Sequence, residues 1–183
     1  MMASAALTPT IQTERLILRG FRADDVAALH KIVSNRENLR YFPRTEPWAQ
    51  ERVERWLNSQ PTHWQTHGFG WYLVEQQTTG QLMGWCGLRE LEETQEVEVL
   101  YLFDKPFWGQ GYATEAARRC VADGFRHAGL ETIIGLTLLG NLASQRVLEK
   151  AGLVFTNEAL YFGVTCNRFV IDQPRFQIFY EQK

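Results

Sequence analysis

Residues 106–117, Pro-Phe-Trp-Gly-Gln-Gly-Tyr-Ala-Thr-Glu-Ala-Ala (PFWGQGYATEAA), join bulky aromatic residues to two glycines and lead directly into a helix-forming segment. A helix that begins after Gly109 and Gly111 exposes its first, unpaired N–H groups in a concave turn, where the helix dipole adds roughly half a positive charge. Because glycines lack the Cβ atoms that would keep a phosphate away from these amides, the turn suits a diphosphate. The segment alone is equally compatible with glycines that only permit a tight strand-to-helix turn.

Two other phosphate-binding loops are excluded by inspection. A P-loop requires the pattern G-x-x-x-x-G-K-[ST], which does not occur in the sequence. The dinucleotide fingerprint G-x-G-x-x-G would place its third glycine at Thr114, and the following segment (residues 132–141, TIIGLTLLGN) does not end in the acidic residue that would hold a ribose. The glycine turn therefore belongs to neither class.

The composition is typical of one globular domain spanning residues 1–183. Hydrophobic residues make up 45% of the chain and charged residues 22%, which is enough for a full core. The formal net charge is −2 and no block of Lys and Arg occurs, so nucleic acid is not an expected partner. No stretch resembles a secretory leader or approaches the ~18 apolar residues of a membrane span, so a cytoplasmic protein without a membrane partner is expected.

The sequence predicts no metal site. Cys86, Cys120 and Cys166 are odd in number and widely separated, which favours reduced core thiols over disulfides or a metal cage. His63 and His67 are spaced as H-x-x-x-H, but the residues between them do not form the H-E-x-x-H arrangement of a zinc site.

Outward from the glycine turn, hydrophobic periodicity predicts strands that alternate with helices. Helices are predicted over residues 22–35, 45–60 and 141–152, and from the glycine turn to HAGL (127–130). Strands are predicted over residues 14–21, 95–103, 132–140 and 175–180, with two more around the turn at Thr78-Thr79-Gly80 and a loop over 61–70. This order predicts a mixed α/β sheet flanked by helices.

Four segments in this order closely resemble the GCN5-related N-acetyltransferases (GNAT), in particular the branch of the RimJ and RimL ribosomal-protein N-terminal acetyltransferases. They are ERLILRGF (14–21), GFGWYLVEQQTTGQLMGWCGL (68–88), EVEVLYLFDKPFWGQGYATEAARR (96–119) and NLASQRVLEKAGLVF (141–155). The resemblance implies an α/β GNAT fold, in which a mixed, mostly antiparallel sheet with a splayed central pair of strands is flanked by helices. It also implies that acetyl-CoA is the co-substrate.

The resemblance further implies which residues hold the coenzyme. The family's coenzyme-A loop, [QR]-x-x-G-x-[GA], corresponds to Trp108, Gly109, Gln110, Gly111, Tyr112 and Ala113, followed by Thr114. Trp108 departs from the Gln or Arg of many members, which removes one side-chain contact and leaves the backbone amides. Main chain of the splayed strand would pair with the pantetheine arm, through Tyr101, Leu102 and Phe103. Asn141 and Ser144 match the branch's N-x-x-S near the thiol arm.

Acetyl transfer from a thioester to an amine needs a base, a polarised carbonyl and a proton for the leaving thiolate. By its position in the family motif, Glu98 is expected to take the ammonium proton directly or through water. A main-chain N–H of the splayed strand would stabilise the oxyanion. Ser144 is expected to assist the leaving sulfur, with helix capping as its alternative role, and Tyr161 is a weaker candidate for the acid. Direct attack in a ternary complex is favoured, because no cysteine lies in a matching motif.

The acceptor amine is left open by the sequence. A protein N-terminal α-amine, as in RimJ and RimL, is the leading expectation. A small amine such as an aminoglycoside or polyamine is the alternative, and the acidic segment ELEETQEVE (90–98) would suit it or be a solvated hairpin. A catalytically silent module that only binds coenzyme A is a third possibility. A monomer or a homodimer is expected.

Overall fold

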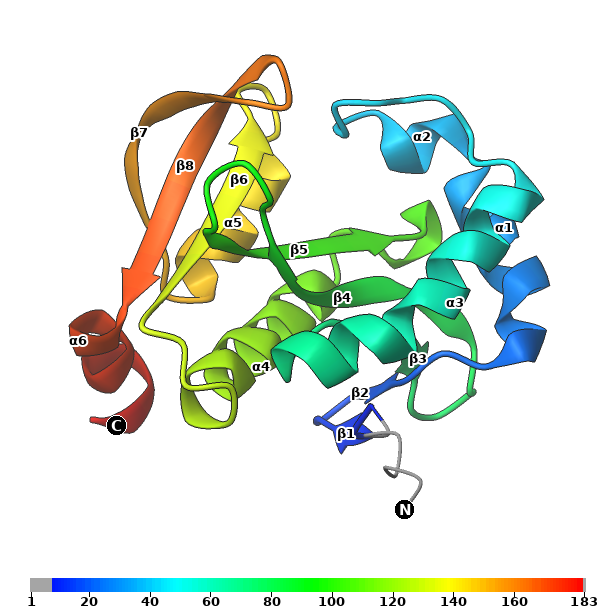
Figure 1. Cartoon of the computed structure of the whole chain (residues 1–183), viewed down its shortest axis with the longest axis horizontal. Helices are drawn as coiled ribbons and strands as arrows, with labels where there is room; N and C mark the ends of the chain where they lie inside the picture. The colour runs from blue at the N-terminus through cyan, green and yellow to red at the C-terminus, as the bar shows by residue number, and fades with distance from the viewer. Residues whose placement is uncertain (1–7, 183) are drawn as a thin grey trace.

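The computed structural model describes residues 8–182, so the first seven residues, on which part of the expected absence of a leader rests, lie outside the described residues. Eight strands form one sheet in the order β1-β2-β3-β4-β5-β6-β8-β7, with helices on both faces (Figure 1). The strands are β1 (Ile11–Gln12), β2 (Leu16–Arg19), β3 (Trp71–Gln76), β4 (Leu82–Glu90), β5 (Val97–Phe103), β6 (Thr132–Leu138), β7 (Val154–Tyr161) and β8 (Val164–Asp172).

The helices divide between the two faces of the sheet. Those before β3 are η1 (Ala23–Asp25), α1 (Val26–Val33), α2 (Arg36–Leu39) and α3 (Gln50–His67). Those after β5 are η2 (Lys105–Phe107), α4 (Tyr112–Arg126), α5 (Leu142–Lys150), α6 (Gln173–Phe176) and η3 (Gln177–Glu181). Apolar residues of α1 and of α3 up to Leu57 pack on one face of the central strands, whereas those of α4 pack on the other face, in the same cluster as Trp64 near the end of α3.

The sheet is mostly antiparallel, as predicted. Strands β2, β3, β4 and β5 form the expected meander, and β6, β8 and β7 form a second antiparallel group. The two groups are joined by β5 and β6, which run parallel and share a single residue pair, Glu98 with Ile134. Beyond that pair the two strands diverge (Figure 1), which confirms the splayed central pair.

The second predicted helix differs from the structure at both ends. The helix α3 begins at Gln50 instead of Thr45, and it continues through Pro61 to His67, where a loop was predicted. Pro61 removes one helical hydrogen bond, but tertiary packing maintains the helix beyond it. The buried indole of Trp64 donates to the carbonyl of Trp71 at 3.1 Å, and Gly68 ends the helix in the left-handed conformation.

The predicted last strand over residues 175–180 is wrong, because this segment is helical. Asp172 caps the new helix by accepting from the Arg175 amide at 3.0 Å, and proline occupies its first turn. Phe176 and Tyr180, four residues apart, stack with ring centroids 5.0 Å apart, and Phe176 also stacks on Phe125 of α4 at 4.5 Å. An alternating aromatic pattern was therefore read with the wrong period, while the hairpin of β7 and β8 was missed.

The short helix α2 is anchored to the end of β5 through Asn38. The Asn38 side chain donates to Asp104 at 2.8 Å and accepts from the Lys105 amide at 3.0 Å. The Asn38 side-chain nitrogen also donates to the carbonyl of Ile32 in α1 at 2.9 Å. This buried side chain holds the helices before β3 at a fixed position beside the central strands. Within residues 8–182, no helix is long and apolar enough to cross a membrane.

We predict that Gly84→Ala destabilises the fold. Gly84 adopts φ 153° next to a register shift between β3 and β4, and a Cβ there would overlap the main-chain oxygen of Leu102 in β5. Relieving the overlap requires the central strands to separate, so we expect a loss of about 2 kcal/mol or more in the free energy of unfolding, measured by denaturant titration. Gly140→Ala is the matched control, since its Cβ would meet nothing within 4 Å. Equal stability of the two variants would contradict this account.

Candidate active site

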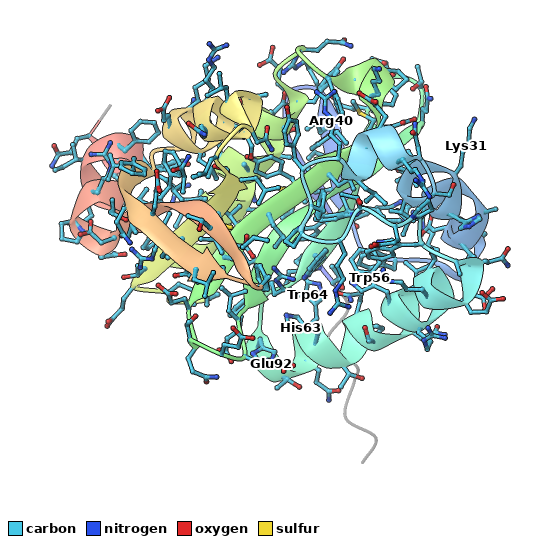
Figure 2. All side chains as sticks on the ribbon, turned by 90° about the horizontal axis from the view of Figure 1, so that it is seen from above. Lys31, Arg40, Trp56, His63, Trp64 and Glu92 are labelled. Atoms are coloured by element: carbon cyan, nitrogen blue, oxygen red, sulfur yellow. The ribbon has the colours of Figure 1, made fainter. Side chains whose placement is uncertain are left out.

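A cleft of about 850 Å³ opens where β5 and β6 separate. One side, here called the α3 wall, consists of side chains from α3 and the loop before it, chiefly Trp48, Arg52, Trp56, Gln60 and His63. The other side, the α5 wall, consists of residues from β6 and the start of α5, namely Thr137, Asn141 and Ser144. In Figure 2 the labelled Trp56 and His63 project from α3 toward the sheet. Glu98 and Tyr101 of β5 also line the cleft. The two predicted catalytic residues, Glu98 and Ser144, therefore both lie in it.

Five buried polar side-chain atoms have no hydrogen-bond partner within residues 8–182, and all five belong to residues that line this cleft. They are Gln60 Oε1, His63 Nε2, Trp85 Nε1, Arg89 Nε and Thr137 Oγ1. An unpaired buried polar atom costs about 1–3 kcal/mol, so proteins keep such atoms where a ligand or water completes the bonding. Their concentration in one place marks the cleft as a binding site.

The strand β5 supplies the cleft with side chains from both faces of the sheet. Successive side chains of a strand point to opposite faces. Glu98 therefore lies on the α3 face with Leu100 and Leu102, whereas Tyr101 lies on the face covered by α4 and α5. Because β6 has diverged from β5, the two faces meet at the gap beside these residues. A group bound on one face can react there with a group bound on the other.

Glu98 is a buried carboxylate with a single charged partner. Its side chain accepts a hydrogen bond from Arg89 Nη2 at 2.6 Å, and Arg89 lies opposite it on β4. Burial raises the pKa of the Glu98 carboxyl, while the charge of Arg89 and its hydrogen bond oppose that shift. A carboxylate with a raised pKa is a stronger base, so Glu98 is suited to accept a proton from a group in the cleft.

Ser144 is held by hydrogen bonds on two sides. Its amide donates to the Asn141 side chain at 3.2 Å, which makes Asn141 the N-cap of α5. The Ser144 hydroxyl lies 2.7 Å from the Tyr101 hydroxyl, a contact that joins α5 to β5 across the gap. Burial raises the pKa of Tyr101, although the hydrogen bond with Ser144 lowers it, so the phenol keeps its proton. The pair forms a proton-bearing relay at the α5 wall.

Main-chain groups of β5 face the gap at alternate residues. The bonds from Leu91 N–H to Glu96 C=O and from Asp104 N–H to Met83 C=O fix which residues bond to β4. By this alternation the amide and carbonyl of Leu102 point at β4. The Leu102 main chain therefore does not face the gap, where it was expected to pair with the pantetheine arm. Tyr101 and Phe103 face the gap, and the Phe103 carbonyl accepts from the Trp108 indole at 2.6 Å. The amide and carbonyl of Tyr101 and the amide of Phe103 therefore face the gap.

Gly109 and Gly111 adopt left-handed backbone conformations, with φ of 74° and 83°. The sequence left two roles open for these glycines, and both fit the observed turn. A side chain would be strained at either position, so the turn requires glycine. A Cβ at Gly109 would meet nothing within 4 Å, so the turn is also open on its outer side. The Glu115 amide donates to the Gly111 carbonyl at 3.0 Å, which leaves the amides of the first helical turn, residues 112–114, at the open end of α4.

The turn is braced by the segment that precedes β2. The Arg15 guanidinium donates to the Gln110 carbonyl at 2.9 Å and to the Glu115 carboxylate at 2.7 Å. Thr13 donates to the same carboxylate at 2.6 Å. Although burial opposes the charged form, these hydrogen bonds lower the pKa of the Glu115 carboxyl. Arg15 thus balances a negative charge that would otherwise stand beside any anion bound at the helix end.

Sequence reasoning missed two side chains of the cleft and proposed one residue that lies outside its lining. Arg89 and the hydroxyl of Tyr101 carry no motif, because each acts through a partner brought close by the fold. Tyr161 does not line the cleft, and its hydroxyl donates to Glu96 at 2.7 Å, next to the ion pair of Glu96 with Arg168. Glu96 is held by these two side chains. No group of three or more potential metal ligands occurs within residues 8–182.

Comparison with known proteins is consistent across sequence and structure. A model of the acetyltransferase (GNAT) domain family matches residues 15–154, well over half of the chain. The Bacillus subtilis protein YkkB is 31% identical over 147 residues, which cover 79% of this chain and 84% of YkkB.

Two solved structures with bound coenzyme A share the fold. RimL, a ribosomal alpha-N-protein acetyltransferase, superposes with a TM-score of 0.77 at 20% identity over 90% of this chain and 98% of RimL. The spermidine N-acetyltransferase from Vibrio cholerae, in complex with coenzyme A and spermine, gives a TM-score of 0.74 at 20% identity over 90% and 99% of the two chains. At this identity the likeness concerns the fold.

We predict that Gly111→Val abolishes coenzyme A binding while the protein stays folded, because the new side chain stands at the helix end that would receive the diphosphate. In wild type, coenzyme A at about 100 times its dissociation constant should add about 2.7 kcal/mol to the free energy of unfolding. Calorimetric melting with and without coenzyme A measures this gain. Gly129→Val is the control, because Gly129 also has a positive φ, of 67°, but lies beyond the other end of α4. Retained affinity in folded Gly111→Val would remove the turn from the site.

Proposed function

Because the chain belongs to the GNAT family of acetyltransferases and is an acetyl-CoA-dependent N-acetyltransferase, we propose that its acceptor is the α-amine at the N-terminus of a polypeptide. The proposal rests chiefly on two unpaired donors on the α3 face, the indole N–H of Trp85 and the Nε–H of Arg89. Both groups can only donate, so they require an acceptor atom in the bound molecule. Peptide carbonyls supply such atoms, whereas a protonated polyamine offers donors alone.

Residues of this chain are assigned to each step. The glycine turn and the first amides of α4 fit a diphosphate, and the open edge at Tyr101 fits an extended arm that continues toward the cleft. The coenzyme supplies the activated acetyl thioester. Glu98, on the α3 face, takes the proton that the attacking amine loses as the new C–N bond forms. The Tyr101 N–H stabilises the oxyanion, and the hydroxyls of Ser144 and Tyr101 return a proton to the sulfur as the C–S bond breaks.

A small polycationic amine is the second candidate acceptor. Glu90, Glu92 and Glu93 line the cleft, so part of the acidic segment faces the site instead of solvent alone. Carboxylates of this kind would attract the ammonium groups of a polyamine or an aminoglycoside. The unpaired donors of the α3 face argue against a polyamine, and the hydroxyl oxygens of an aminoglycoside could satisfy them. The two acceptor classes therefore need a direct comparison.

A thiol-release assay with acetyl-CoA separates these functions. The acceptors are a peptide with a free N-terminus and one internal lysine, spermidine, and an aminoglycoside. We expect the peptide to be the best acceptor, with the acetyl group found on its N-terminus by mass spectrometry. Faster release with either small amine would overturn the polypeptide assignment. Coenzyme A binding without release for any amine would indicate a silent binding module.

We predict that Glu98→Gln slows acetylation of the N-terminal peptide by about 10²-fold at pH 7, the low end for loss of a general base. The wild-type rate should rise with pH through the raised pKa of Glu98, because only the ionised carboxylate accepts a proton. The Glu98→Gln variant should lack this rise in rate. It should recover part of its rate as pH approaches 8, because a free α-amine, with a reference pKa of about 8, then loses its proton to solvent.

The matched control is Glu96→Gln, two residues away on the same chain segment and outside the cleft lining. It should keep the wild-type pH–rate profile. A Glu98→Gln variant with the same rate and pH dependence as wild type would exclude Glu98 as the base.

We predict that Ser144→Ala lowers kcat about ten-fold and changes the KM for acetyl-CoA little, because assistance to a leaving thiolate matters mainly in the transition state. Tyr101→Phe should give a similar loss, since it removes the hydroxyl 2.7 Å from that of Ser144. Steady-state kinetics at saturating peptide provide the measurement. A change confined to the KM of either variant would point to a purely structural role for the hydroxyl pair.

A further inference from the structure

A row of aromatic rings runs from the start of α3 to the proposed base. Trp48 contacts Trp56 with centroids 5.7 Å apart, and Trp56 contacts Trp71 at 4.8 Å. The Arg89 guanidinium lies 5.9 Å from the centre of the Trp71 ring and forms the ion pair with Glu98. All of these residues line the cleft. The α3 face thus offers a continuous apolar surface that ends at Glu98.

Two positive charges stand at the other end of this surface. Arg52 lies over the Trp48 ring at 4.0 Å, and Arg44 is near enough for its charge to act on Arg52. Neither guanidinium has a hydrogen bond or an ion pair with any residue in the 8–182 range, although both line the cleft. Burial and the charge of Arg44 lower the pKa of Arg52, and the nearby charge of Glu46 only partly opposes this. The two like charges repel each other at this end of the cleft, and a bound anion would relieve that repulsion.

The charges of the cleft are separated along α3. Arg52 and His63 are about 16 Å apart along the helix axis, given a rise of 1.5 Å per residue. Glu90 is the last residue of β4, Glu92 and Glu93 follow it, and the charge of Glu90 acts on His63. Figure 2 shows Glu92 at the His63 end of α3 in that view. An acidic group would be repelled at this end and attracted at the Arg52 end.

We propose that the acceptor carries a carboxylate that binds between Arg44 and Arg52, while its apolar part lies on the tryptophan rings and its amine reaches Glu98. For a polypeptide, this carboxylate is an Asp or Glu side chain within the first few residues. The inference rests on the proposed transfer to an N-terminal amine and narrows it to acidic N-termini. Arg52 lies over the Trp48 ring, and a guanidinium can bind a carboxylate through two parallel N–H groups while its carbon stays on the ring.

The test uses hexapeptide amides with a free N-terminus, so that no terminal carboxylate competes. One Asp, Asn or Lys is placed in turn at positions 2 to 5 in an otherwise neutral sequence. For wild type we expect, at one or more positions, a kcat/KM at least ten-fold higher for Asp than for Asn, mainly through KM, and the lowest value for Lys. The preference should weaken as salt screens the charges. A neutral dipeptide with a free carboxyl end distinguishes an α-carboxylate from a side-chain carboxylate as the group recognised.

The decisive comparison is among arginine variants. Arg52→Gln and Arg44→Gln should each reduce the Asp preference to less than three-fold, and Arg52→Glu should reverse it in favour of Lys. Arg55→Gln is the matched control, because Arg55 is on the same helix and its charge also acts on Arg52, but it does not line the cleft. It should leave the preference unchanged. Thermal melting verifies that each variant is folded, and Arg44, on an exposed loop, provides the test if Arg52 variants are not.

A binding measurement separates failure of this inference from failure of the proposed function. Calorimetry with N-acetylated Asp, Asn and Lys peptides in the presence of coenzyme A needs no turnover. Tighter binding of the Asp peptide to wild type than to Arg52→Gln would support the anion site even if no N-terminus were acetylated. Equal binding and equal kcat/KM for all three peptides would overturn the inference. An Arg52→Gln variant that loses affinity for coenzyme A but keeps the preference for the Asp peptide would overturn it as well.

Discussion

The structure depends on one constraint, which is that β5 and β6 pair at Glu98 with Ile134 and then separate. A continuous parallel pairing would fill the gap with hydrogen bonds and leave no place for a molecule between the strands. The separation frees the Tyr101 main chain and opens the two faces of the sheet to each other. Helices on one face then supply the acceptor wall, and α5 on the other supplies Ser144. The proposed base, Glu98, and the proposed proton donor, Ser144, line the same cleft from opposite faces of the sheet.

The active site is assembled at a cost in stability. Glu98 is buried with Arg89 as its charged partner, and burying an ion pair recovers only part of the hydration energy of its charges. The unpaired polar atoms of the cleft add further cost. Nothing in the core requires these groups, since the two large apolar clusters lie on either side of the central strands. Such local costs are tolerated in proteins where ligand binding or catalysis depends on them.

Short-range signals in the sequence were enough to predict much of this. The glycine turn and the cap of α5 each depend on residues within a few positions of one another, so a motif identifies them. The splayed pair of strands joins residues 36 positions apart and was predicted only through the family resemblance. Arg89 beside Glu98, and Tyr101 beside Ser144, depend on register across the sheet and on the placement of α5, which no local pattern encodes. Pro61 shows the opposite failure, because a strong local signal to end a helix was overridden by the packing of Trp64. The C-terminal aromatics failed because a short apolar run does not distinguish a strand period from a helix period.

The brace of Arg15 on the glycine turn has a consequence for how the protein folds. Its contact with Glu115 joins residues that are 100 positions apart, and its contact with Gln110 spans 95. Closing such long loops costs chain entropy, so these contacts form late in folding, after the local elements. During synthesis the first strand must wait for α4 to emerge before the turn can be fixed. An intermediate with α4 formed and β2 undocked would have a loose coenzyme turn, so competence to bind coenzyme A should be among the last properties that the folding chain acquires.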